Sequence, residues 1–243
     1  MLLLALGGIA GGFINGFAGT GTALFALGFF LSVLGPVHAV AVVALISVLS
    51  GFLGLWVVRA HIVENSRSVA HFTVPGLVGV PIGFALLSTV NADVLRLMVA
   101  ALLITYGAYF GFRSALPRLA TKTPITDATV GFSGGVLGGL ASLSGALPTI
   151  WLSMRDWPKT QTRAVLQTYN VVILSATVGF LALAGAYDRP TLIALAIALP
   201  AGLAAAQVGI YVFKRLSDGQ FRRVLILLCL TMGIGIVINT LSG

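Results

Sequence analysis

Two glycine-rich stretches interrupt long apolar runs and decide the fold, GFAGTGT at residues 16–22 and GGLASLSG at residues 138–145. The first interrupts residues 2–34, which as a single helix would be ~50 Å long at about 1.5 Å per residue. That length exceeds the hydrocarbon core of a bilayer, which is about 30 Å thick. The second interrupts residues 128–153 in the same way. Because an interior glycine costs a helix about 1 kcal/mol relative to alanine, each cluster predicts a point where a helix stops and turns.

The composition places the protein in a membrane. Of the 243 residues, 58% are hydrophobic and only 8% are charged, and the mean hydropathy is +1.06. A soluble domain carries about 25% charged residues. The chain is therefore not a soluble enzyme, a disordered chain or a secreted disulfide scaffold, and we expect an all-α polytopic membrane protein. Six further apolar runs have the ~20 residues that a crossing helix needs, at about 38–58, 70–90, 93–113, 162–185, 190–212 and 219–241.

The two broken regions are copies of each other. When the chain is shifted by 123 residues, seven residues of the first region fall on identical residues of the second, from Gly8 on Gly131 to Leu24 on Leu147. A shift of 126 aligns the later helices. The repeat predicts a first transmembrane half, a cytoplasmic linker and a second transmembrane half, at residues 1–113, 114–127 and 128–243.

The distribution of basic residues favours one topology. If each broken region is a re-entrant hairpin followed by three crossings, twelve of the 14 Lys and Arg residues lie on one side and two on the other. If each is a single kinked crossing, the division is eight to six. The positive-inside rule selects the hairpins, with both termini periplasmic. An odd number of crossings per half makes the two halves inverted repeats, which are typical of secondary transporters with a midplane site.

The helix breaks predict an anion site. At each break a new helix begins, near Thr22 and near Gly145, and its first N–H groups lack partners and carry the positive end of the helix dipole. Such ends bind anions, and hydroxyl groups nearby can donate to oxyanion oxygens. A structural turn is the alternative for these residues, as close helix packing is for the glycines before the breaks. The candidate substrate-binding residues here are Asn15, Gly19, Thr20, Gly21, Thr22, Ser142, Ser144 and Gly145.

A polar stripe on a later span adds three candidates. Arg163, Gln167 and Asn170 lie at i, i+4 and i+7 on one helix face. Polar groups in a membrane usually face the bundle interior, so Gln167 and Asn170 are candidates for the cavity lining, with interhelical hydrogen bonding as the alternative. Arg163 is expected at the cytoplasmic end, where it either attracts an anion into a vestibule or anchors the helix at the headgroups.

The motifs resemble those of the TauE/SafE family of membrane permeases. The resemblance rests on GIAGGFINGFAGTG at residues 8–21 and GFSGGVLGGLASLSG at residues 131–145, and on HAVA at 38–41 and TRA at 162–164. It covers nearly the whole chain. The resemblance implies export of sulfite, sulfonates or related sulfur oxyanions, often across a bacterial inner membrane.

The expected function is therefore that of a secondary transporter or facilitator for a small sulfur-containing oxyanion, working in the direction of export. An anion importer and a passive anion channel remain alternatives, because they would use the same site. An enzyme is not expected, since no acid/base pair or metal set is visible within a span. We expect no cofactor, no metal and no nucleic-acid partner; the expected partners are the anionic substrate and the lipid bilayer, and a homodimer is possible.

Overall fold

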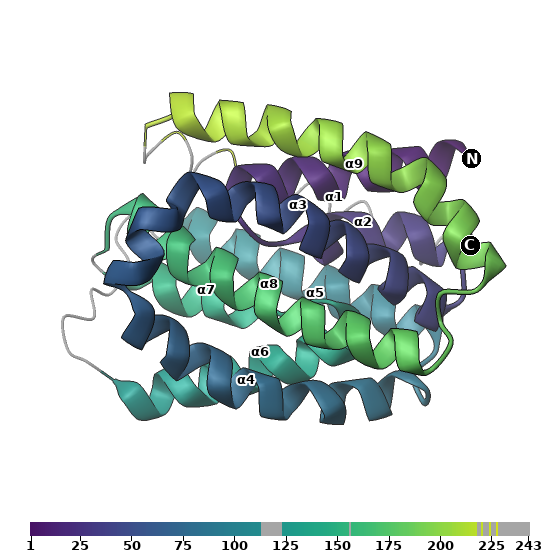
Figure 1. Cartoon of the computed structure of the whole chain (residues 1–243), viewed down its shortest axis with the longest axis horizontal. Coiled ribbons are helices and arrows are strands. Elements are labelled where there is room, and N and C mark those ends of the chain that lie inside the picture. Colours follow the sequence, from purple (N-terminus) through teal and green to yellow (C-terminus); the bar gives the residue numbers. More distant parts are fainter. Residues whose placement is uncertain (113–122, 156, 218–219, 221–223, 225–226, 228–243) are drawn as a thin grey trace.

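The computed structural model describes residues 1–112, 123–155 and 157–217, together with residues 220, 224 and 227. These residues form α-helices joined by short turns, and the helices lie roughly along one common direction (Figure 1). In chain order they are α1 (Leu2–Ala18), α2 (Thr22–Leu31), α3 (Pro36–Glu64), α4 (Ser66–Leu87), α5 (Ala92–Phe112), α6 (Pro124–Ala141), α7 (Ala146–Ser153), α8 (Lys159–Leu183) and α9 (Arg189–Arg215).

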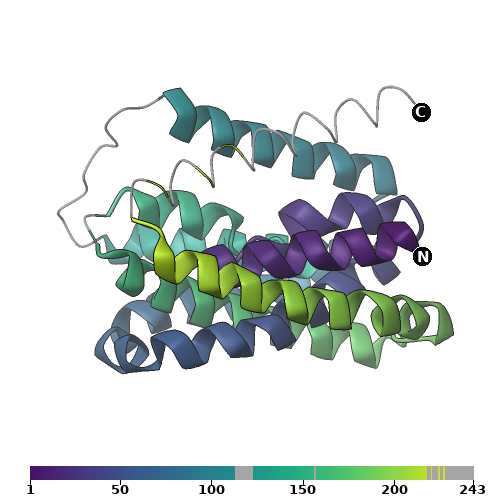
Figure 2. The same ribbon diagram turned by 90° about the horizontal axis from the view of Figure 1, so that it is seen from above.

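Four helices in the described part of the chain are long and apolar enough to cross a membrane. They confirm four of the six expected spans, and their crossing segments are Pro36–Trp56, Ser66–Leu87, Thr160–Leu183 and Arg189–Arg215. The run expected at 93–113 forms α5, which lies along one side of the bundle (Figure 2). Nearly all of the run expected at 219–241 and most of the expected linker lie outside the described residues.

The first glycine-rich stretch breaks the helix, as expected. After α1 the backbone of Gly19 and Gly21 adopts φ angles of 83° and 97°, in the left-handed region that glycine enters without strain. The chain then reverses, so that α2 runs back along α1. Gly11 faces Thr22 and Gly7 faces Phe30, which is the register of two antiparallel helices. We call α1 and α2 hairpin 1.

The second glycine-rich stretch forms a second reversal, which we call hairpin 2 and which consists of α6 and α7. Ser142 lies at the break with a φ of 56°, a value that non-glycine residues rarely adopt. Gly134 faces Pro148 across the hairpin. Nearer the open end, Trp151 Nε1 donates a hydrogen bond of 2.6 Å to Asp127 Oδ1. These contacts place α7 antiparallel to α6.

Glycine faces bring each hairpin into backbone contact with a spanning helix. The glycines at positions 8, 12 and 16 of α1 lie directly against the backbone of residues 198, 202 and 206 of α9. Those at 131, 135 and 139 of α6 lie against residues 72, 76 and 80 of α4. Both pairs run parallel, and Figure 2 shows α1 beside α9. A side chain at these glycines would occupy the space of a neighbouring carbonyl group, so each hairpin and its spanning helix form one tightly packed unit.

The two hairpins open toward opposite ends of the bundle. At one end His38 Nδ1, at the start of α3, lies 2.8 Å from Thr191 Oγ1 and 3.4 Å from Asp188 Oδ1, at the start of α9. Hairpin 1 opens here, because α1 runs parallel to α9. At the other end Gln161 Nε2 of α8 donates to Asn65 Oδ1, just before α4, at 2.6 Å. Hairpin 2 opens there, because α6 runs parallel to α4 (Figure 1).

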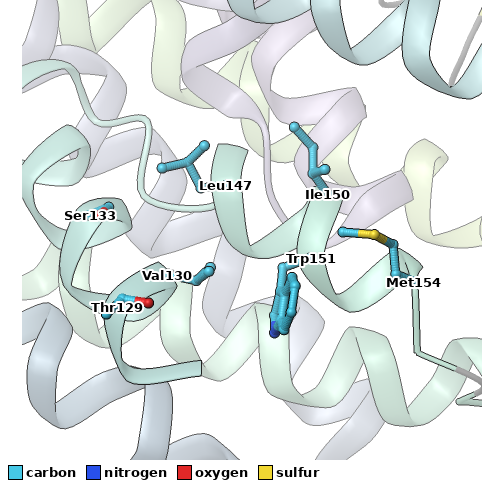
Figure 3. Close-up of a pocket in the computed structure, with 7 residues that line it drawn as sticks. All are labelled: Thr129, Val130, Ser133, Leu147, Ile150, Trp151 and Met154. Carbon is cyan, nitrogen blue, oxygen red and sulfur yellow. The ribbon is translucent and has the colours of Figure 1, made fainter. Parts of the chain in front are cut away.

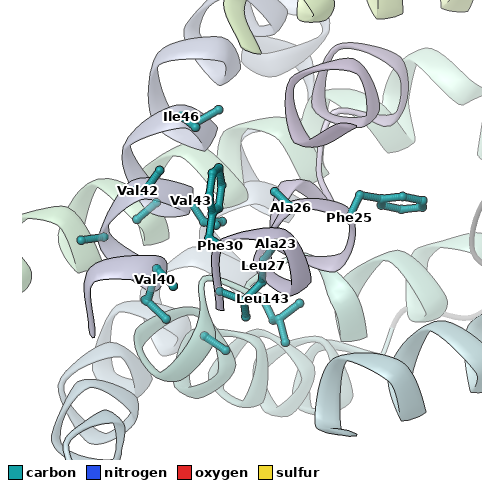
Figure 4. Close-up of a cluster of buried hydrophobic side chains, with 14 of the residues drawn as sticks. Ala23, Phe25, Ala26, Leu27, Phe30, Val40, Val42, Val43, Ile46 and Leu143 are labelled. Carbon is teal, nitrogen blue, oxygen red and sulfur yellow. The ribbon is translucent and has the colours of Figure 1, made fainter. Parts of the chain in front are cut away.

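The apolar core holds hairpin 1 in the centre of the bundle. Leu27 and Phe30 of α2 are fully buried. They face Val43 and Ile46 of α3, with Leu143 from the break in hairpin 2 beneath them (Figure 4). The core therefore joins α2 to the tip of the opposite hairpin, which fixes the two breaks relative to each other.

Glycine packing makes the first testable prediction. Gly12→Ala places a methyl group against the carbonyl of Gly202, and overpacking of this kind costs about 1–3 kcal/mol. Gly179→Ala is the matched control, because a Cβ at Gly179 meets nothing within 4 Å. We expect Gly12→Ala to lower the melting temperature of the detergent-solubilised protein and Gly179→Ala to leave it unchanged or raise it. Equal melting temperatures for the two variants would contradict the close contact between α1 and α9.

Candidate functional site

The tips of the two hairpins meet inside the protein. Gly145 lies so close to Thr20 that a Cβ at position 145 would overlap the Thr20 hydroxyl oxygen. The structure thus brings the two predicted halves of the site together. It also seals them from the surface, since five polar tip residues are each less than 5% exposed: Asn15, Thr20, Thr22, Ser142 and Ser144.

Asn170 of α8 connects the two tips. Its Oδ1 accepts a hydrogen bond of 2.6 Å from Ser144 Oγ of hairpin 2 and one of 3.5 Å from Thr20 Oγ1 of hairpin 1. The Asn170 side chain is buried, and its Nδ2 has no hydrogen-bond partner among the described residues. A buried amide group that donates to nothing costs free energy, so this N–H₂ group is available to a ligand held between the tips.

Two further amide side chains lie beside Gly51 of α3. Asn15 Nδ2 donates to Ser47 O at 3.0 Å and to Ser50 Oγ at 2.6 Å, and Gln167 Nε2 donates to Gly51 O at 3.2 Å. Both amides are buried, and within the described ranges neither Asn15 Oδ1 nor Gln167 Oε1 receives a hydrogen bond. Gln167 therefore forms an interhelical hydrogen bond to α3, whereas Asn170 bonds to the two hairpin tips, and both amides keep unused polar atoms.

Arg163 lies inside the protein, at 2% exposure. Its Nη2 donates to Gly16 O at 2.7 Å and its Nη1 to Phe17 O at 3.4 Å, while the guanidinium group lies 4.0 Å above the ring of Phe213. The sequence predicted a vestibule or headgroup position for this side chain. Its burial contradicts the headgroup position, and the structure places the side chain at the end of α1, where the helix break leaves the last carbonyl groups without helical donors. A role in a vestibule stays a prediction.

The remaining predicted residues shape the tips. Gly19 lies against Gln167 Oε1 and the stem of Arg163, where a larger residue would collide. Gly21 precedes the first residue of α2 and has the positive φ noted above. Ser142 Oγ donates to Val40 O at 3.2 Å. These contacts anchor both tips against α3 and α8.

Ser47 and Ser50 complete the site, although they are not among the predicted site residues. Ser47 is buried, and within the described part of the chain neither its hydroxyl nor that of Thr22 has a hydrogen-bond partner. The sequence carried a signal for Ser47, because the shift of 123 residues places it opposite Asn170. That signal is weak, since serine is common at helix contacts in membranes.

Two apolar grooves lie away from the tips. One, between α6 and α7, is lined mainly by Val130, Leu147, Ile150, Trp151 and Met154 (Figure 3). The other follows the outer face of α6 near Phe132. Thr129 and Ser133 line both grooves, but neither groove has a charged side chain among the described residues of its lining and neither lies at the tips. Within the described ranges, no three His, Cys, Asp or Glu side chains come together as a metal site would require.

Four helices that are long and apolar enough to cross a membrane, together with two helical hairpins whose tips meet at a polar centre, fit a multi-pass membrane protein. The family model for the sulfite exporter TauE/SafE matches residues 3–236, nearly the whole chain. The protein therefore belongs to the TauE/SafE family, whose members are membrane transporters and not enzymes. No curated protein and no solved structure matches the chain. The family match confirms the resemblance found in the sequence and the transport class.

The position of Arg163 makes the second testable prediction. Arg163→Met removes both hydrogen bonds from the guanidinium group to the carbonyl groups at the end of α1. Losing charged hydrogen bonds of this kind costs about 2–4 kcal/mol, which lowers the melting temperature of a chain of this size by roughly 5–10 °C. The control is Arg215→Met, because Arg215 is exposed and its guanidinium group lies over the ring of Tyr211 at the surface. Equal melting curves for the two variants would contradict the role of Arg163 at the helix end.

Proposed function

We propose that the protein is a secondary transporter that moves a small sulfur-containing oxyanion, sulfite or an organosulfonate, by binding it between the two hairpin tips. The observation that carries this proposal is the meeting of Thr20 and Ser144, from opposite hairpins, at one buried asparagine. The site also holds buried donors without a partner among the described residues, namely Asn170 Nδ2 and the hydroxyls of Thr22 and Ser47. Oxyanion oxygens are the partners that such donors require.

The helix termini favour negative charge at the same place. Helix α2 begins at Thr22 and α7 begins at Ala146, so both direct their N-terminal ends toward the tips. The first N–H groups of a helix carry the positive end of its dipole and bind anions without a lysine or arginine. An anion at the tips would face these two ends and the unused side-chain donors together.

The contact pattern supports two inverted repeats. The shift of 123 residues relates α1 to α6, and the shift of 126 residues relates α4 to α9. The contact of α1 with α9 is therefore equivalent to the contact of α6 with α4. The contact of His38 with Asp188 likewise becomes that of Gln161 with Asn65 under the shift of 123. Each of the two contact types thus occurs twice, at opposite ends of the bundle. Inverted repeats with broken helices are the usual basis of alternating access.

A carrier fits the burial of the site better than an open channel. The tip side chains are closed off from both ends in this conformation. Cargo would enter when hairpin 1 and α9 separate from hairpin 2 and α4 at one end, and leave when they separate at the other. Movements of this kind, in which packed units rock about a fixed site, are typical of secondary transporters.

Export is the direction that the charges favour. An inside-negative potential drives an anion outward by about 2.3 kcal/mol per charge per 100 mV. The described carboxylates lie at helix ends, at positions 64, 93, 127 and 188, and not at the tips. Outward movement of an anion needs no coupled cation. The proposed setting is the bacterial inner membrane with both termini periplasmic, as the positive-inside rule predicts.

The tip site is tested by removing hydroxyl groups without changing shape. In proteoliposomes we expect Thr22→Val and Ser47→Ala each to lower kcat/KM for sulfite at least fivefold, because each variant loses an unused hydroxyl donor and a lost hydrogen bond to an anion costs about 1.5–3 kcal/mol. Thr129→Val, at an exposed position of α6, and Ser88→Ala, in the exposed turn after α4, are the matched controls. If the site variants transport sulfite as well as the controls do, the cargo does not bind between the tips.

Counterflow distinguishes a carrier from a channel. Vesicles preloaded with unlabelled sulfite should accumulate external labelled sulfite transiently above its equilibrium level, because the returning site carries labelled cargo inward. A channel equilibrates the label without overshoot. Protein-free vesicles set the background. An uptake curve that rises to equilibrium without overshoot, at saturating internal sulfite, would contradict the carrier mechanism.

A further inference from the structure

Two buried amide oxygens in the site lack hydrogen-bond donors. The orientation of each amide is fixed by its nitrogen, since Asn15 Nδ2 and Gln167 Nε2 both donate to backbone carbonyl groups, which can only accept. Rotating either amide would place oxygen against oxygen. Asn15 Oδ1 and Gln167 Oε1 are therefore acceptors, and neither receives a donor from the described residues.

These acceptors belong to the tip site. Gln167 Oε1 lies 2.8 Å from the place that a Cβ would take at Gly19, the residue before Thr20. Both amide nitrogens lie within 4 Å of the place that a Cβ would take at Gly51, Gln167 Nε2 at 3.4 Å and Asn15 Nδ2 at 3.9 Å. An anion that offers only acceptor oxygens would satisfy Asn170 Nδ2 and the free hydroxyls, but it would leave both amide oxygens unpaired. A cargo that also carries a hydrogen-bond donor satisfies both kinds of group.

The charge of the site sets the charge of the cargo. Arg163 is buried beside Gly19, and both of its hydrogen bonds go to neutral carbonyl groups. Within the described ranges no carboxylate forms an ion pair with it. A buried charge without a counter-charge is costly, so an anion nearby is stabilised. One negative charge balances Arg163, whereas two would leave a net negative charge in a medium of low dielectric constant.

We propose that the tip site selects a singly charged oxyanion that carries its own hydrogen-bond donor, either a protonated oxyanion such as bisulfite or a sulfonate with a hydroxyl group. The inference rests on the proposed transport function and narrows its substrate class. A doubly charged oxyanion without a donor, such as sulfate, fits neither the two acceptors nor the single buried arginine.

A matched pair of sulfonates tests this selectivity. Ethanesulfonate and 2-hydroxyethanesulfonate carry the same charge and differ in one hydroxyl donor. In proteoliposomes of the full-length wild type, we expect kcat/KM to be at least tenfold higher for the hydroxyl compound. Gln167→Met, which replaces the acceptor with an apolar group of similar length, should bring the ratio of the two values close to one. Gln207→Met, on an exposed surface of α9, should keep the wild-type ratio.

The readout is the ratio of the kcat/KM values for the two sulfonates, measured on one protein preparation. A loss of folded protein lowers both values equally and leaves the ratio unchanged. The wild-type ratio needs no variant at all, and competition by sulfate provides a second measurement on the wild type. We expect sulfate at equal concentration to leave uptake of 2-hydroxyethanesulfonate unchanged.

Four results would overturn the inference, three of them without touching the transport function. Equal kcat/KM for the two sulfonates, or strong competition by sulfate, would remove the selectivity while leaving the transport function intact. If Gln167→Met keeps the full tenfold preference for 2-hydroxyethanesulfonate, then Gln167 Oε1 does not accept a hydrogen bond from the hydroxyl group of the cargo. Absence of flux for sulfite and both sulfonates would instead remove the proposed function, and this inference with it.

Discussion

Backbone groups freed at a helix break must find partners inside the protein, because hydrocarbon offers none. This constraint organises the centre of the molecule. The last carbonyl groups of α1 are satisfied by Arg163, which brings a positive charge into the interior. The N-terminal ends of α2 and α7 point toward the hairpin tips, where Asn170 Oδ1 accepts hydrogen bonds from Thr20 of one hairpin and Ser144 of the other. The same break that ends a helix thus creates the positive environment that an anion requires.

Close packing at the glycine faces joins each hairpin to one long helix as a single unit. Because α1 contacts α9 and α6 contacts α4 through their backbones, each hairpin would move together with its partner helix in the proposed transport cycle. The tips are then the contact surface between two rigid units, with α3 and α8 beside them. A site between two such units can be exposed at one end of the bundle at a time, which links the glycine pattern of the sequence to the proposed transport cycle.

The sequence predicted the breaks, four of the spanning helices and the transport class, because these depend on local composition and on a repeated motif. It did not predict the position of Arg163, which depends on where α1 ends relative to α8 in three dimensions. The orientation of the side-chain amides of Asn15 and Gln167 could not be predicted from the sequence either, because the carbonyl groups that fix it belong to another helix, α3. The expected halves, the inverted relation between them and the substrate role of the tip residues stay predictions.

The central claim is that an anion binds where the two hairpin tips meet, and anomalous scattering tests it most directly. Crystals grown with selenite, the selenium analogue of sulfite, would reveal the anion by the selenium signal alone. The account predicts a peak between the tips, within hydrogen-bonding distance of Asn170 Nδ2 and the Thr22 hydroxyl. A selenium peak confined to another part of the molecule, such as the groove between α6 and α7, would contradict it.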